Sequence, residues 1–252
     1  MAGDNSLEGK RALVSGASRG IGRAIALGLA DAGCDVAGLA RSGDALAELG
    51  REVEARGRSF LPVELDLADV GSIAAGAERA WSWRGGLDVL VNAAGLIIRT
   101  GPLEVTPAEW DEVFDVNVRG TYFLTQAVGE RMLAADGGSV VTVTSLAGEV
   151  VTRAAVSYQA SKAALIQTTR ALAVHWAPKV RVNAVAPGYV RTDLNRAWLE
   201  DEENLGYVLG KTPLGRVGEP PDVVGVVTFL ASPAAAYVTG QNVRVDGGWS
   251  VQ

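Results

Sequence analysis

The chain has 252 residues, of which 48% are hydrophobic and 21% are charged, and its formal net charge is −6. This acidic balance, without a basic run, argues against a nucleic-acid partner, and no apolar stretch is long enough to cross a bilayer. One cysteine, Cys34, and one histidine, His175, leave little for a disulfide or a metal site. The segment from Met1 to Lys10 is polar and lacks the apolar core of a secretory signal, so we expect a soluble cytoplasmic protein.

The first predicted element is an apolar strand over residues 11–15, followed by a glycine-rich turn and a helix over about residues 20–32. Glycine lets the backbone approach a pyrophosphate, and a helix N-terminus offers N–H groups and a positive dipole end. The sequence therefore predicts a dinucleotide site here, although the turn could instead only pack helix on strand. The candidate contacts in its Gly-x-x-x-Gly-x-Gly spacing are Gly16, Ser18, Arg19, Gly20, Ile21 and Gly22.

The second predicted strand, residues 35–40, ends in Ala40-Arg41-Ser42 without an acid. NAD sites usually place an acid at this point, where it binds the ribose hydroxyls. Arg41, with Arg19 from the glycine turn, is suited to a 2′-phosphate through its planar fork of donors. We therefore predict NADP as the cofactor, with NAD as the alternative if both arginines are only solvated.

A helix over residues 44–56, a strand over 60–65, a helix to about residue 83 and a fourth strand over 87–91 follow. This alternation predicts an α/β fold with a doubly wound parallel sheet, and right-handed crossovers bring the strand ends to one edge, where ligands bind. Asp66, just past the third strand, is a candidate adenine contact, or else a cap of the next helix.

The next segment predicts one long helix, a strand and a second long helix. Thr106 and Pro107 are typical of a helix start, and the helix continues through residue 128 with one notable polar residue, Asn117. The β-branched run at residues 139–144 predicts a strand, and Ser145 lies just past it.

Tyr158 and Lys162 lie four residues apart in a predicted helix over about residues 154–177. They therefore share one face, one turn apart. An ammonium beside a phenol favours the phenolate and lowers the pKa of the tyrosine, which suits proton transfer near neutral pH. The alternative is an ordinary exposed pair.

After a sixth predicted strand at residues 180–185, residues 193–212 interrupt the strand–helix alternation. An insertion of this length predicts a lid or substrate loop, or else a plain surface excursion. A last helix over residues 219–231 and a strand over 242–245 complete the chain. No linker divides it, so residues 1–252 are expected to form one domain.

Taken together, these residues resemble the short-chain dehydrogenase/reductase family, of the classical type, from residue 10 to residue 249. The matching pieces are the glycine turn, Asp66, Asn92-Ala93-Ala94-Gly95, Asn117, Ser145, Tyr158-x-x-x-Lys162, and Pro187-Gly188 followed by Thr192. The chain departs from the family pattern at Ala93, where a second Asn is common, and at Ser15, where Thr is common.

The resemblance implies a seven-stranded Rossmann fold and a catalytic set. It implies that Tyr158 is the general acid/base, that Lys162 lowers its pKa and holds the nicotinamide ribose, and that Ser145 binds the substrate oxygen. Asn117 would support a water-linked proton relay. The further cofactor contacts that it implies are Leu67, Asn92, Ala94, Gly95, Pro187, Gly188, Val190 and Thr192. A homotetramer is also implied.

Within the family, the segments around residues 95–99, 186–189 and 245–249 look most like sugar-acid dehydrogenases. Arg99 and Arg153 are candidate partners of a substrate carboxylate, or else solvated surface charges. A 3-oxoacyl-carrier-protein reductase and a small-ketone reductase are alternatives, although the acidic run at residues 200–203 disfavours docking of an acidic carrier protein. A catalytically idle, cofactor-binding regulator is a remote alternative, because all four catalytic residues are present.

Overall fold

Residues 5–252 are described here in a computed structural model, and seven parallel strands of this part form one sheet. The order across the sheet is β3-β2-β1-β4-β5-β6-β7, which confirms the predicted doubly wound sheet. The strands are β1 (Arg11–Ser15), β2 (Asp35–Ala40), β3 (Phe60–Glu64), β4 (Val89–Asn92), β5 (Gly138–Val143), β6 (Val180–Pro187) and β7 (Asn242–Val245). The prediction for the polar segment that starts at Met1 lies partly outside the described residues.

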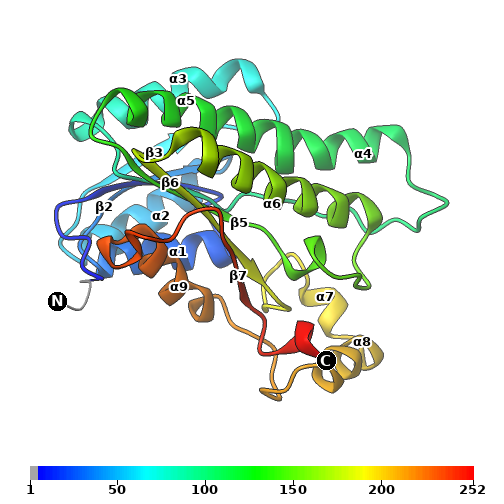
Figure 1. Cartoon of the computed structure of the whole chain (residues 1–252). Helices are drawn as coiled ribbons and strands as arrows, with labels where there is room; N and C mark the ends of the chain where they lie inside the picture. The colour runs from blue at the N-terminus through cyan, green and yellow to red at the C-terminus, as the bar shows by residue number, and fades with distance from the viewer. Residues whose placement is uncertain (1–4) are drawn as a thin grey trace.

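The inner strands are mostly apolar and buried because helices cover both faces of the sheet (Figure 1). One face carries α1 (Gly20–Asp31), α2 (Gly43–Glu54) and α9 (Pro221–Ala231), and the other carries α3 (Val70–Ser82), α5 (Thr121–Ala134) and α6 (Val156–Trp176). Ile25 and Val227 belong to the first apolar core, and Ile73 and Leu124 belong to the second. None of the helices in the described part is both long and apolar enough to span a membrane.

The helix predicted from Thr106 onward is divided by a wide turn. Thr106 and Glu109 form the expected capping box at the start of α4 (Pro107–Phe114). A π-helical turn, η2 (Asp115–Gly120), then joins α4 to α5 and carries the buried Asn117. Such turns are rare and are frequently found at functional sites. The prediction of one regular helix is therefore wrong at Asn117.

The insertion at residues 193–212 contains two short helices, α7 (Arg196–Leu199) and α8 (Glu202–Gly210), which lie beyond the sheet in Figure 1. They have a small apolar core of their own, formed by Leu199, Val208 and Val217. The acidic run has a local role, because the Asp201 carboxylate accepts a hydrogen bond of 2.9 Å from the backbone N–H of Asn204 at the start of α8.

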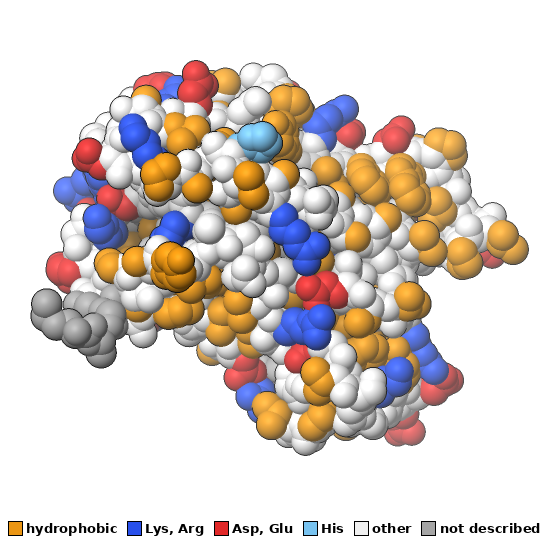
Figure 2. All heavy atoms as spheres, in the orientation of Figure 1, with side chains coloured by type: hydrophobic (Ala, Val, Ile, Leu, Met, Phe, Trp, Pro, Cys, Tyr) orange, Lys and Arg blue, Asp and Glu red, His pale blue; other side chains and the backbone are white. Residues whose placement is uncertain are grey.

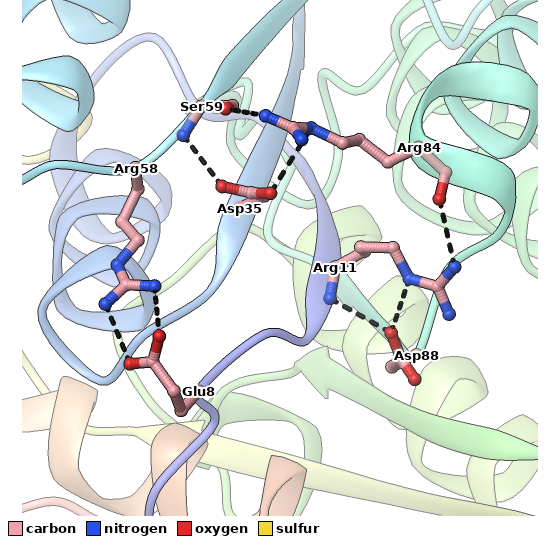
Figure 3. A network of polar contacts seen from close by, with 7 residues as sticks. All are labelled: Glu8, Arg11, Asp35, Arg58, Ser59, Arg84 and Asp88. Atoms are coloured by element: carbon pink, nitrogen blue, oxygen red, sulfur yellow. Dashed lines mark hydrogen bonds and ion pairs between the residues drawn. The ribbon is translucent and has the colours of Figure 1, made fainter.

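The amino ends of the strands, opposite the carboxyl ends of the same sheet, are held by a polar network (Figure 3). Asp88 accepts hydrogen bonds from the backbone N–H of Arg11 at 3.0 Å and from its Nε at 2.8 Å. Asp35 accepts one from the backbone N–H of Ser59 at 2.8 Å and lies 3.3 Å from the Arg84 guanidinium. These contacts fix the starts of β1, β2, β3 and β4 and leave the carboxyl ends for a site.

Candidate active site

The glycine turn after β1 forms a cradle that a side chain would fill. Gly16 has a φ of +69°, and a Cβ added there would lie 2.7 Å from the backbone of Ala94. The Ncap residue of α1, Arg19, makes no side-chain capping bond, and the first turn of α1 contains no acid. The first N–H groups of the helix are therefore available for an anion, and the turn fits the pyrophosphate of a dinucleotide.

A cavity of about 200 Å³, the glycine-turn cavity, opens at this turn. Twelve of the predicted cofactor contacts line it: Gly16, Ser18, Arg19, Gly20, Ile21, Gly22, Arg41, Asp66, Leu67, Ala94, Gly95 and Thr192. A second cavity of about 120 Å³, the tyrosine cavity, is lined by Ser145, Tyr158, Lys162, Pro187, Gly188 and Val190. Ile21, Gly95 and Thr192 line both, so the two cavities adjoin and form one elongated site.

Arg41 lies at the end of β2 with its side chain 71% exposed, and it contributes to the glycine-turn cavity. Its guanidinium is 3.8 Å from the Asp66 carboxylate, an exposed ion pair of little strength. Asp66 also accepts a hydrogen bond from the N–H of Ala68 at 3.0 Å, whereas the cap of α3 is Asp69. Of the two roles predicted for Asp66, helix capping is therefore excluded. Because its ion pair with Asp66 is weak, Arg41 is free to contact a phosphate.

Tyr158 and Lys162 lie in the first turns of α6 and face the tyrosine cavity together with Ser145. Lys162 is 4% exposed, its Nζ donates a 2.9 Å hydrogen bond to the carbonyl of Val143, and it lies 5.7 Å from the centre of the Tyr158 ring. Pairing between β4 and β5 ends at Thr142, so the Val143 carbonyl lies beyond the last β4–β5 pair. The ammonium therefore serves as a donor at the end of β5.

Burial governs the pKa values of this pair. It raises the pKa of Tyr158, while the Ser145 hydroxyl and the Arg99 guanidinium lower it. Burial also lowers the pKa of Lys162 to about 8. Tyr158 keeps part of its surface open to the cavity, but protein atoms surround it closely enough for desolvation to dominate. The net lowering of the Tyr158 pKa that the sequence predicts is therefore not found in this structure, because burial outweighs Ser145 and Arg99, and the effect of Lys162 stays a prediction.

Asn117 is fully buried in η2 and is held in one orientation. Its Oδ1 accepts a 2.8 Å hydrogen bond from the N–H of Leu96, and its Nδ2 donates to the Leu96 carbonyl and to Ser161 Oγ, each at 3.0 Å. A Cβ placed on Gly95 would lie 3.4 Å from both Asn117 Oδ1 and Lys162 Nζ. The structure thus brings Asn117 close to the Tyr158–Lys162 pair.

Four predicted site residues lie outside the lining of both cavities: Asn117, described above, and Asn92, Arg99 and Arg153. Asn92 is buried beneath the site, where its Nδ2 donates to Thr125 Oγ1 at 2.8 Å and to Thr142 Oγ1 at 3.3 Å, so its side-chain amide has a structural role and its cofactor contact stays a prediction. Arg99 and Arg153 lie at the rim. The Arg99 guanidinium is 5.3 Å from the centre of the Trp198 ring, and its charge lowers the pKa of Tyr158.

Arg153 is bound to the insertion. Its Nη1 donates to the Glu203 carboxylate at 2.9 Å, and its guanidinium lies 4.3 Å from the centre of the Tyr207 ring on α8. Arg99 makes no ion pair with any described carboxylate, so the two arginines differ in what they are free to bind.

Sequence reasoning missed Leu96 and Ser161, whose backbone and hydroxyl orient Asn117. Neither carries a local signal, because their partner is set by the fold. Among residues 5–252, no group of three or more His, Cys, Asp or Glu side chains is placed to hold a metal ion.

Known proteins and one family model match this chain over almost its whole length. A family model described as enoyl-(acyl carrier protein) reductase matches residues 16–250. The 2-dehydro-3-deoxy-D-gluconate 5-dehydrogenase of Escherichia coli (strain K12) is 39% identical over 246 residues, which cover 97% of this chain and 96% of that protein. The 3-oxoacyl-[acyl-carrier-protein] reductase FabG of Vibrio harveyi is 36% identical, over 96% of this chain and 98% of the relative.

Solved structures of similar proteins also match almost the whole chain. A protein of Beutenbergia cavernae, assigned as an NAD(P) dependent gluconate 5-dehydrogenase and holding NADP at low occupancy, has a TM-score of 0.95 and 43% identity, covering 99% of this chain and 100% of its own. A gluconate 5-dehydrogenase of Burkholderia cenocepacia J2315, in complex with NADP and tartrate, has a TM-score of 0.94 and 33% identity, with 98% of each chain covered.

Proposed function

The chain belongs to the short-chain dehydrogenase/reductase family of enzymes, which act on CH–OH groups with NAD(P), and we propose that it interconverts a secondary alcohol and a ketone on a sugar acid such as gluconate, with NADP(H). The observation that carries the substrate class is the position of Arg99, an arginine beside Tyr158 that no described carboxylate neutralises.

The proposed chemistry divides hydride and proton transfer. NADP(H), when bound, accepts or donates the hydride. Tyr158 moves the proton to or from the reacting oxygen, and the Ser145 hydroxyl donates a hydrogen bond to that oxygen as negative charge develops on it. Lys162, with a pKa of about 8, is able to exchange a proton near neutral pH and returns it to Tyr158. Asn117, held by Leu96 and Ser161, supports this relay.

The proposed preference for NADP rests on Arg41 and Arg19 at the end of the glycine-turn cavity. The end of β2 offers no acid to a pair of ribose hydroxyls. Ser42, which follows Arg41, instead caps α2 by accepting a hydrogen bond from the N–H of Ala45. A 2′-phosphate would compete with Asp66 for Arg41, and a dianion in bidentate contact is the stronger partner than a carboxylate 3.8 Å away. NADP in the structure of the Beutenbergia relative supports the same preference.

The substrate carboxylate is assigned to Arg99 and not to Arg153. Arg99 is held over Trp198 by a cation–π contact, which leaves the donors of its fork for a carboxylate. Arg153 already binds Glu203 and covers Tyr207, so its proposed task is to keep α8, within the substrate loop of residues 193–212, next to the site. Tartrate, itself a hydroxy acid, in the complex of the Burkholderia relative supports a carboxylate-binding site.

Purified protein tests the proposal with NADP or NAD and a panel of substrates: gluconate, 5-ketogluconate, 2-keto-3-deoxygluconate, an acetoacetyl thioester and simple ketones. Turnover of a sugar acid, faster with NADP than with NAD, is the expected result. Turnover of the acetoacetyl thioester alone would establish the alternative of a 3-oxoacyl-carrier-protein reductase, which is the activity of the Vibrio relative. Cofactor binding without turnover of any of them would favour a regulator.

We further propose a homotetramer in the cytoplasm. Figure 2 shows hydrophobic side chains gathered over α4 and the loop before it, and Leu103 in that loop is 99% exposed. Tyr122 and Phe123 on α5 are also exposed. Apolar surface of this kind is typical of a face that a partner covers. Light scattering after size-exclusion chromatography should give four times the mass of one chain, and a monomer would contradict the proposal.

A further inference from the structure

Asn242, the first residue of β7, connects the last strand to the turn that carries Ser145. The turn is η3 (Leu146–Gly148), and it is preceded by Thr144 and followed by Glu149. Asn242 Oδ1 accepts a 2.7 Å hydrogen bond from Thr144 Oγ1, and Asn242 Nδ2 donates a 2.8 Å hydrogen bond to Glu149 Oε1. One side-chain amide therefore holds the residue before Ser145 and the residue that ends its turn.

The orientation of this amide is fixed by the charges around it. Burial acts to raise the pKa of Glu149, but hydrogen bonds from Asn242 and Arg244, with the charges of Arg244 and Arg170, hold the pKa below its ordinary value. Glu149 is therefore a carboxylate that only accepts, and it must receive the Nδ2 of Asn242. The Oδ1 then faces Thr144, which is 2% exposed and whose hydroxyl also lies 3.0 Å from the Val185 carbonyl.

Between the two Asn242 hydrogen bonds, which we call the clamp, further contacts restrain the turn after Ser145. Ser145 Oγ accepts a 3.1 Å hydrogen bond from the N–H of Ala147, and its carbonyl accepts one of 3.0 Å from the N–H of Gly148. Gly148 packs so closely on α6 that a Cβ there would lie 2.8 Å from the backbone carbonyl carbon of Lys162. The turn is thus held against α6 by close packing and against β7 by Asn242.

We infer that Asn242 is a positioning residue for the proposed reaction, holding Ser145 Oγ at the distance from Tyr158 that hydride and proton transfer require. The inference rests on the proposed function, because it assigns Ser145 the substrate oxygen. Displacement of a reacting group by about 1 Å can cost about a hundredfold in rate, so a clamp remote from the chemistry has a measurable effect. The chain places this clamp 97 residues beyond Ser145, on the last strand of the sheet.

The test exchanges the polarity of one hydrogen bond. Asn242→Asp keeps the shape and still accepts from Thr144, but it sets a second carboxylate against Glu149. The double variant Asn242→Asp with Glu149→Gln restores the bond with donor and acceptor exchanged and the total charge of the original chain. Gln241→Glu is the matched control, since it makes the same amide-to-carboxylate change on an exposed side chain that bonds the Thr239 carbonyl.

Three readouts are compared. Hydrogen exchange of the Ala147 and Gly148 amides reports the order of the Ser145 turn without any substrate. The turnover number with an active substrate and the dissociation constant of NADPH separate the chemistry from cofactor binding. We expect Asn242→Asp to accelerate both amide exchanges and to lower kcat about tenfold to a hundredfold with unchanged NADPH affinity, and we expect the double variant to recover both.

The pH profile adds a readout that loss of stability alone would not move. Burial raises the pKa of Tyr158, and the groups that lower it are Ser145 and Arg99, with Lys162 buried beside them. A displaced Ser145 no longer lowers the pKa of Tyr158, so the tyrosine limb of the kcat profile should move to higher pH in Asn242→Asp and return in the double variant.

Unchanged amide exchange in Asn242→Asp would overturn the inference, as would an unchanged kcat despite faster exchange, or an equal loss in Gln241→Glu. If Asn242→Asp does not fold, Thr144→Val removes the same clamp from its other end and is judged by the same readouts. If the unaltered protein turns over no substrate in the panel, the proposed function fails, and the exchange data still decide whether Asn242 orders the turn.

Discussion

Lys162 carries a charge in a place where a charge is costly, and this gives a prediction about stability. Its side chain is 4% exposed, it donates one hydrogen bond to the Val143 carbonyl, and it forms no ion pair with a described carboxylate. Burial lowers its pKa from 10.5 to about 8. Each factor of ten in proton affinity corresponds to about 1.4 kcal/mol, so the protonated form destabilises the fold by about 3 kcal/mol at neutral pH.

The sign of the pH dependence follows from which state binds the proton. Below pH 8, Lys162 is protonated in the folded and the unfolded chain, and the full penalty is present. Between pH 8 and 10.5 the unfolded chain holds a proton that the folded chain has released, so the free energy of unfolding rises with pH. Above 10.5 neither state is protonated and the penalty is gone. The Lys162→Met variant lacks this dependence.

Urea unfolding of the cofactor-free protein, at one subunit concentration and at pH values from 7 to 10.5, measures the effect. The free energy of unfolding of the original chain should rise by about 3 kcal/mol relative to Lys162→Met over this range. The constant offset from the lost Val143 contact does not enter the comparison. Lys179→Met is the control, because its exposed ammonium also donates to backbone carbonyls, those of Leu133 and Ala135. A difference between the original chain and Lys162→Met that stays constant within about 1 kcal/mol would refute the argument that burial sets the proton affinity of Lys162.

Four further predictions concern the site. Arg41→Ala should raise KM for NADP about tenfold to a hundredfold and leave KM for NAD within about twofold, because a charge-assisted contact is lost only with the 2′-phosphate; equal changes for both cofactors would contradict it. Tyr158→Phe should lower kcat by about 10² to 10⁴ while fluorescence titration shows unchanged NADPH binding, whereas retained turnover would exclude it as the acid/base. Arg99→Gln should raise KM for a sugar acid at least about tenfold and leave KM for a neutral ketone unaltered. Arg153→Gln, which removes the contact to Glu203, should raise KM for both substrates alike, and the reverse pattern would exchange the two assignments.

Much of the fold follows from local patterns. Most strands are largely apolar runs of four to eight residues, most are followed by a helix signal, and right-handed crossovers leave one arrangement of strand ends. The sequence could therefore predict where the glycine turn lies and that Tyr158 and Lys162 lie next to each other. The insertion was predictable in position, but its two helices have little periodicity at such short lengths.

What the sequence could not supply depends on distant contacts. The pair Asn242 and Glu149 is separated by 93 residues and has no spacing signal. The pKa of Tyr158 is decided by how closely the folded chain surrounds it, which no neighbouring residue reveals. Asn92 sits in a motif that suggested a ligand contact, yet the depth of β4 in the sheet turns its amide toward two threonines.

The π-helical turn at Asn117 makes the site depend on a count of residues as well as on their identity. A π-helical turn holds one residue more than an α-helical turn, so removing one residue between 115 and 120 would either close the turn into regular α-helix or rotate everything after it by about 100°. Either Asn117 would leave Leu96 and Ser161, or Leu124 and Val128 of α5 would leave the core. A homologous chain shorter by one residue here could keep every proposed catalytic side chain and still lack the proposed relay. Alignments that place gaps freely in this helix would conceal that difference, and redesigns of this enzyme should treat the length of the segment as fixed.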